Sequence, residues 1–105
     1  MSVCITRRGE SMPAYLIGHI KVLVQDAWQD YVAGVAKSLA PFSAEIVFRG
    51  KRHAVLAGEH DKELAVVIRF ANQVQLQEWF DSAAYQDLIP LRDRAADVTI
   101  ISCDA

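Results

Sequence analysis

Residues 14–39 decide the fold, because their hydrophobic period changes half way through the run AYLIGHIKVLVQDAWQDYVAGVAKSL. Over residues 14–24 the side chains alternate between two faces, as in a strand. One face carries Leu16, Gly18, Ile20 and Val22, and the other carries Tyr15, Ile17, His19 and Lys21. The apolar residues then take helical spacing, at Trp28, Tyr31, Val32, Val35 and Leu39. A strand followed by an amphipathic helix over residues 25–39 is therefore predicted.

Three extended segments are predicted in the middle of the chain. Pro41 disfavours helical geometry at the residue before it and so closes the first helix. Residues 44–48 then read as a strand, and residues 53–57 as a shorter extended stretch that forms a hairpin or a bulged strand with it. Residues 64–70, LAVVIRF, are rich in β-branched residues and predict a central strand.

The last third of the chain predicts helices followed by one strand. Asn72 with Gln75 is a variant of the capping box that starts a helix, and Ser82 is expected to cap a further short helix. Pro90 lacks an amide hydrogen, so residues 90–95 are predicted as a separate turn or a kinked continuation. Residues 97–102 form the final strand.

This order of elements predicts an α+β fold. It is the ferredoxin-like βαββαβ sandwich, in which two helices cover one face of an antiparallel sheet. The other face would be a large exposed apolar patch in a monomer, so a second copy of the chain is expected to cover it in a homodimer. Residues 1–12 are predicted to be an N-terminal extension, and residues 13–105 a single domain.

Composition narrows the classes of function. The 105 residues are 52% hydrophobic and 23% charged, which is enough for a packed core and excludes disorder. The formal net charge of -2 argues against nucleic acid or anionic lipid as a partner, and no apolar run approaches the roughly 20 residues that span a bilayer. Cys4 and Cys103 lie near opposite ends with no secretory leader, so we expect no disulfide framework and a cytoplasmic location.

One long run resembles a known family. Residues 79–97 read WFDSAAYQDLIPLRDRAAD, and they are accompanied by PAY at 13–15, LAPF at 39–42 and VIRF at 67–70. Together these segments resemble domain-of-unknown-function family 1330, over nearly the whole of residues 13–104. The resemblance implies a ferredoxin-like fold assembled as a dimeric α/β barrel, and it implies no established reaction. Arg69 is a departure, since the family usually has an acidic residue there.

His19 and Arg69 are the candidate catalytic residues. If the first and central strands pair in parallel, these side chains converge on one pocket. A histidine titrates near neutral pH and could exchange a proton there, while Arg69 could hold a carboxylate or an enolate. The alternative interpretation of His19 is a half-buried histidine in the dimer interface.

The candidate ligand-binding residues are Tyr15, Trp79, Tyr85 and Arg92. Trp79 and Tyr85, with Trp28, Tyr31 and Phe80, either line an aromatic pocket or simply seal the helices on the sheet. Arg92 and Arg94 either grip an anion at the pocket mouth, form salt bridges across subunits, or remain solvated.

No metal or cofactor is expected. Glu59, His60 and Asp61 are adjacent on a polar loop, and together with His53 they lack the spacing of a metal site. The helix over residues 73–80 has no axial ligand for haem. Two hypotheses follow. The first is a homodimer that binds a small aromatic or anionic organic molecule between helices and sheet, with cofactor-independent catalysis as an extension. The second is a non-catalytic structural or stress-related dimer.

Overall fold

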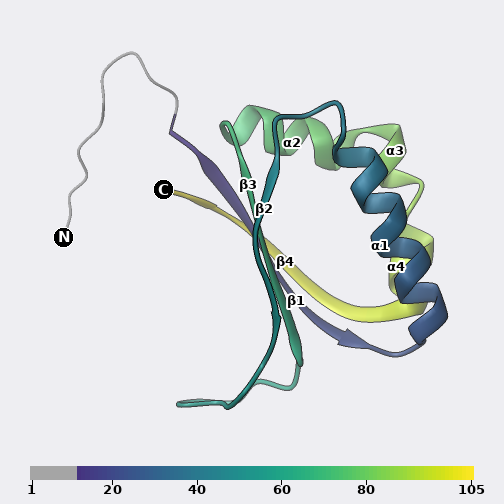
Figure 1. Cartoon of the computed structure of the whole chain (residues 1–105), viewed down its shortest axis with the longest axis vertical. Helices are drawn as coiled ribbons and strands as arrows, with labels where there is room; N and C mark the ends of the chain where they lie inside the picture. Colours follow the sequence, from purple (N-terminus) through teal and green to yellow (C-terminus); the bar gives the residue numbers. More distant parts are fainter. Residues whose placement is uncertain (1–11) are drawn as a thin grey trace.

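The computed structural model describes residues 12–105. The predicted extension at residues 1–12 therefore lies outside the described residues, apart from Met12. The elements follow the order β1 (Ala14–Val22), α1 (Gln25–Leu39), β2 (Glu45–Lys51), β3 (Leu64–Phe70), α2 (Gln73–Asp81), α3 (Ala83–Gln86), α4 (Ile89–Ala95) and β4 (Ala96–Asp104). This is the ferredoxin-like βαββαβ fold, with the second helix divided into three, and the predicted α+β class is confirmed (Figure 1).

The four strands form one antiparallel sheet in the order β2-β3-β1-β4. β3 lies inside the sheet, as predicted. The antiparallel sheet was predicted, and β1 and β3 run antiparallel, with Tyr15 opposite Arg69 and His19 opposite Ala65. The parallel pairing on which the convergence of His19 and Arg69 depended therefore does not occur. The crossover through α1 makes β2 parallel to β1, and one strand position remains between them. β3 occupies this position, and because it starts near the end of β2 it runs antiparallel to both neighbours.

The segment between β2 and β3 differs from its prediction. β2 continues to Lys51, but residues 53–57 are not a strand, so that prediction is wrong. Lys51 pairs with Leu64, the first residue of β3, and the backbone amide of Arg52 donates to the carbonyl of Glu63 at 2.6 Å. The recorded strand pairing of β2 ends there, and the chain turns through Gly58, whose φ is 77°.

Two side-chain caps fix the helices as predicted. The Oδ1 atom of Asn72 accepts a hydrogen bond from the backbone amide of Gln75 at 2.9 Å and starts α2. The hydroxyl oxygen of Ser82 accepts from the backbone amide of Tyr85 at 3.3 Å and starts α3. Pro90 sits in the first turn of α4, where a missing amide hydrogen costs no hydrogen bond. Residues 90–95 are thus helical and belong to α4, which follows α3 after the turn at residues 87–88.

All helices lie on one side of the sheet (Figure 1). The hydrophobic core fills the layer between them and consists of Ala14, Leu16, Tyr31, Leu39, Ile68, Phe70, Leu76, Trp79 and Tyr85. Leu16, Ile68 and Phe70 are the residues of β1 and β3 that the alternating pattern directs to this side. No helix within residues 12–105 is both long enough and apolar enough to cross a membrane.

No helix of the described chain covers the opposite face of the sheet (Figure 1). We call it the open face. It carries half-buried Ile17 and Val67 in its centre and Ile101 and Phe48 toward its edges, with 48% and 52% of their surface exposed. The segment between β2 and β3 extends toward this side at one end of the sheet (Figure 1), and within it Leu56 is 95% exposed.

Candidate functional site

A cavity of about 700 Å³ lies between α1 and the helix-facing side of the sheet. Its floor is hollowed at Gly18, which has no side chain and lies between Val66 of β3 and Ile100 of β4. A Cβ atom at Gly18 would lie 3.1 Å from the Cγ1 atom of Val66, so the surrounding side chains already close in around this position. The glycine thus leaves only a shallow depression, closely bounded by Val66, in an otherwise branched, apolar surface.

The wall of the cavity opposite the sheet is aromatic and aliphatic. α1 contributes Trp28, Tyr31, Val32 and Val35, and α2 contributes Trp79. The rings of Trp28 and Tyr31 are stacked, with their centroids 5.2 Å apart. A flat apolar molecule would find rings on one side and branched strand residues on the other, an arrangement typical of small-molecule pockets.

A buried hydrogen-bonded network holds the tyrosine of this wall. The hydroxyl of Tyr31 lies 2.8 Å from that of Tyr85 on α3, and the Nη1 atom of Arg92 on α4 donates to the Tyr85 oxygen at 3.0 Å. Since arginine has no acceptor, the Tyr85 oxygen accepts from it and its hydroxyl hydrogen can be donated to Tyr31. The network therefore ties three helices together behind the cavity.

The network also changes how Tyr31 and Arg92 titrate. Burial, followed by the neighbouring Tyr85 hydroxyl, raises the pKa of Tyr31 far above its ordinary value, so its phenol stays protonated. Burial alone would lower the pKa of Arg92, but its hydrogen bonds to Tyr85 and Asp93 outweigh this and raise it. Both groups thus keep one protonation state across the physiological range.

Trp79 is anchored from both ends. Its ring centroid lies 4.3 Å from that of Tyr85, and its indole Nε1 donates a hydrogen bond to the hydroxyl of Ser38 at 2.8 Å. Ser38 in turn donates to the carbonyl oxygen of Val35 at 2.8 Å. This buried polar pair fixes the position of the indole at the cavity.

Two cationic residues reach the cavity because of a β-bulge. The pairing of β2 with β3 shifts between Ile46 and Phe48, which places one extra residue, Val47, in β2. Beyond the bulge the faces are exchanged, so Arg49 and Lys51 lie on the helix-facing side with Ile46. Phe48 and Gly50 lie on the open face, where the ring of Phe48 covers Gly50 so closely that a Cβ there would lie 2.7 Å from the ring.

The sequence analysis missed this pair of residues. Strict alternation from Ile46 would have put Arg49 and Lys51 on the open face. Gly50 within the strand was the one signal, since a glycine inside a strand often accompanies a bulge.

The predicted ligand-binding residues divide between the two faces of the sheet. Trp79 lines the cavity, and Tyr85 and Arg92 lie directly behind it in the network described above. Tyr15 points to the open face, opposite Arg69. The aromatic residues of the helices thus serve as core and as pocket lining at once: Trp28, Tyr31 and Trp79 face the cavity, while Phe80 and Tyr85 pack behind them.

The predicted catalytic residues do not come together. His19 and Arg69 share the open face, but Arg69 is opposite Tyr15, four residues along β1 from His19, or about 13 Å at strand spacing. Arg69 instead forms an ion pair with Glu45, 3.4 Å away. The expected convergence depended on a parallel pairing of the two strands, which does not occur because β1 and β3 are antiparallel.

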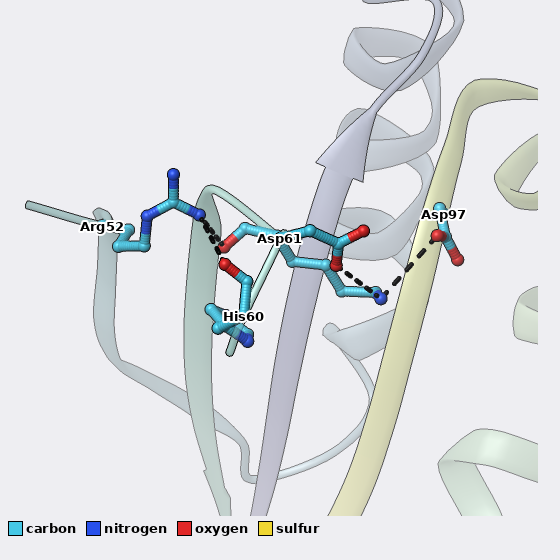
Figure 2. Close-up of polar contacts among 5 residues, drawn as sticks. Arg52, His60, Asp61 and Asp97 are labelled. Atoms are coloured by element: carbon cyan, nitrogen blue, oxygen red, sulfur yellow. Dashed lines mark hydrogen bonds and ion pairs between the residues drawn. The ribbon is translucent and has the colours of Figure 1, made fainter. Parts of the chain in front are cut away.

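His19 has different neighbours, in a second hollow on the open face. This hollow, about 310 Å³, is lined by His19, His60, Lys62 and Thr99, and the two imidazole rings meet edge to face at 4.9 Å. Figure 2 shows the segment that enters β3 crossing β1 here: Lys62 pairs with Asp61 at 3.5 Å and with Asp97 of β4 at 3.7 Å. The charge of Lys62 lowers the pKa of Asp61.

Arg52 secures the same segment by donating to the carbonyl oxygens of His60 and Lys62, both at 3.3 Å (Figure 2).

Among residues 12–105, no group of three or more His, Cys, Asp or Glu side chains is arranged to hold a metal ion.

The sequence comparisons identify a family but no activity. Residues 13–104 match the family model described as a domain of unknown function, DUF1330. No curated protein shows significant sequence similarity to the chain.

Solved structures share the fold. A protein of unknown function from Rhodopseudomonas palustris aligns with a TM-score of 0.77 and 13% identity, covering 91% of this chain and 84% of that one. SnoaB, a cofactor-independent oxygenase from Streptomyces nogalater, aligns with a TM-score of 0.66 and 7% identity over 90% and 94% of the two chains. A dimeric ferredoxin-like protein of unknown function from Thermobifida fusca aligns with a TM-score of 0.62 and 14% identity over 90% and 92%.

Proposed function

Since the chain belongs to the DUF1330 family, whose description names no function, we propose from its own geometry that it is a homodimer that binds a small, flat, largely apolar organic molecule in the cavity under α1. The cavity itself carries the proposal. It offers about 700 Å³, lined mainly by apolar residues, with the depression at Gly18 on one side and the stacked rings of Trp28 and Tyr31 on the other.

The homodimer is proposed from the open face. Ile17, Val67 and Ile101 form an apolar strip across the three strands β3, β1 and β4, and a small domain gains core by burying such a strip against its own copy. The structural neighbour from Thermobifida fusca is described as dimeric, which supports the same arrangement. The two cysteines near opposite ends of the chain favour the reducing cytoplasm as its location.

Binding is better supported than catalysis in this cavity. Within the described chain, the lining of the cavity contains no histidine, cysteine, aspartate or glutamate that could act as a general base. Tyr31 does line the cavity, but its phenol stays protonated and so does not serve as a base either. SnoaB is described as a cofactor-independent oxygenase. Comparable chemistry in this cavity would have to rely on a reactive ligand that the cavity positions and shields from water. The catalytic roles of His19 and Arg69 remain a separate proposal, located on the open face. If a screen finds a substrate and the His19→Ala variant turns it over at the wild-type rate, the catalytic role of His19 is contradicted.

The alternative is a non-catalytic dimer with no ligand, and the open face alone would favour it. The neutral fluorescent probe N-phenyl-1-naphthylamine distinguishes the two, since it is flat, apolar and uncharged. We expect saturable binding to the wild type, and its loss in Gly18→Val, which fills the depression, and in Val32→Trp, which fills the cavity from α1. Two filling variants are needed because either could disturb packing, and both are checked for an intact thermal transition.

The open-face variant Val67→Asp is the matched control, since it introduces a charge outside the cavity. Light scattering should show a mass near twice 11.7 kDa for the wild type and near 11.7 kDa for Val67→Asp. Probe binding that survives both filling variants would contradict the ligand site. A wild-type mass of one chain would contradict the homodimer.

A further inference from the structure

Among the residues that line the cavity within the described chain, Arg49 and Lys51 are the only charged ones, and both are cations. The formal net charge of the whole protein is -2, so the positive charge of this pair is opposite in sign to the charge of the protein. Both side chains are exposed toward solvent, which places them at the opening of the cavity rather than in its apolar interior. We call this pair the cationic mouth.

No carboxylate of the described chain neutralises the cationic mouth across the sheet. The residues opposite Arg49 and Lys51 on β3 are Val66 and Leu64. The one carboxylate of β2, Glu45, is engaged on the other face by Arg69. Within residues 12–105, neither Arg49 nor Lys51 forms an ion pair. Within the described residues, an anion entering the cavity would therefore meet two cations that no carboxylate engages in an ion pair.

The spacing of the two side chains suits one anionic group. Residues two apart on a strand share a face and lie about 7 Å from each other, so an arginine and a lysine can approach a carboxylate or sulfonate from both sides. The neighbouring Arg52 does not join them, since its guanidinium is held by the carbonyl oxygens of His60 and Lys62.

We propose that the cationic mouth formed by Arg49 and Lys51 recognises the anionic end of the ligand, so that the cavity takes small organic acids with a flat apolar body. This inference rests on the proposed function, because it assigns one end of the ligand in the same cavity. The apolar body lies between Gly18 and the aromatic wall, and the acid group stays at the opening. There the acid keeps part of its hydration, which avoids the cost of burying a charge.

The test compares two probes of the same shape. 8-Anilinonaphthalene-1-sulfonate carries a negative charge, and N-phenyl-1-naphthylamine has the same ring framework without it. In the double variant Arg49→Gln/Lys51→Gln we expect the dissociation constant of the sulfonate to rise about tenfold, the size expected when two solvent-exposed charge contacts are lost. That of the neutral probe should change less than twofold. Added salt should weaken binding of the sulfonate to the wild type and leave the neutral probe unaffected.

Two further variants make the result specific. Lys37→Gln/Arg94→Gln removes the same two charges from exposed helix positions outside the cavity and should leave both probes unchanged. Arg49→Lys/Lys51→Arg keeps the charges and should retain at least half of the sulfonate affinity. This exchange also separates a loss of charge from a disturbed edge strand.

Each pattern of results has one meaning. If the neutral probe binds in the cavity but the sulfonate is indifferent to Arg49→Gln/Lys51→Gln, the cationic mouth is refuted and the proposed function stands. If Lys37→Gln/Arg94→Gln weakens the sulfonate equally, overall charge explains the effect and the inference is likewise refuted. If neither probe depends on the filling variants at Gly18 and Val32, the proposed function itself fails.

Discussion

Replacing Tyr85 by phenylalanine should destabilise the protein although the ring and its packing remain. Tyr85 is fully buried, and its hydroxyl is the centre of the network with Tyr31 and Arg92. Tyr85→Phe removes a neutral hydrogen bond, worth about 1 kcal/mol, and one from a charged donor, worth about 1.5 kcal/mol or more. Because the Arg92 side chain is 19% exposed, water can satisfy part of the second loss. We expect the free energy of unfolding to fall by about 2 kcal/mol.

This loss corresponds to a shift in melting temperature of roughly 10 °C for a domain of this size, at about 2.1 cal/mol/K of unfolding entropy per residue. The assay is urea unfolding followed by tryptophan fluorescence. Protein concentration must be equal for all variants, because the proposed homodimer would gain stability with concentration.

A double-mutant cycle tests the mechanism directly. Tyr31→Phe alone should cost about 1 kcal/mol, but it should cost little in a Tyr85→Phe background, because the two apolar rings then leave no buried hydroxyl unpaired. We therefore expect a coupling energy of about 1 kcal/mol. A cost of Tyr85→Phe below about 0.5 kcal/mol, or costs that simply add in the double variant, would refute the network.

Three further predictions concern the helix layer. Ser38→Ala leaves the buried indole N–H of Trp79 without its acceptor and should cost about 1–3 kcal/mol in urea unfolding; a neutral effect would show that another acceptor replaces Ser38. Gly34→Ala should stabilise by less than the roughly 1 kcal/mol that the better helix propensity of alanine supplies, because its Cβ would lie 2.6 Å from the Cδ2 of Leu88 and that side chain must shift; the full gain should appear in a Leu88→Ala background. Because burial raises the pKa of Tyr31, its contribution to the free energy of unfolding is fully present below the ordinary tyrosine pKa of about 10. Above that pH the free energy of unfolding should fall by up to about 1.4 kcal/mol per pH unit. If the free energy of unfolding of Tyr31→Phe falls with the same slope as that of the wild type between pH 10 and 11, this assignment is wrong.

Local patterns in the chain predicted most of the secondary structure. The helical stripe from Trp28 to Leu39 predicted α1 with its observed bounds, and the branched run over residues 64–70 predicted β3 in the same way. The caps at Asn72 and Ser82 were also readable, since a cap depends on residues three positions apart. These features are set by neighbours along the chain, so the sequence contains all the information that they need.

The candidate site was only partly predictable. A cleft between helices and sheet with Trp79 at its wall was expected, and the cavity lies there. The relation of His19 to Arg69 was wrong, because parity along one strand assigns a face but does not assign which residue of another strand lies opposite. Arg49 and Lys51 were missed because Val47 exchanges the faces of β2, and a bulge becomes visible only when the partner strand is in place.

What the chain determines alone is therefore the type and extent of its elements, and the side of each regular element that is apolar. Only the tertiary structure decides which charged side chains meet at the cavity and which lie on the open face. The physical reason is that hydrophobic period acts between residues a few positions apart, whereas strand direction and register result from packing segments that are distant in sequence. A single extra residue in β2 is enough to turn two cations from one face of the sheet to the other.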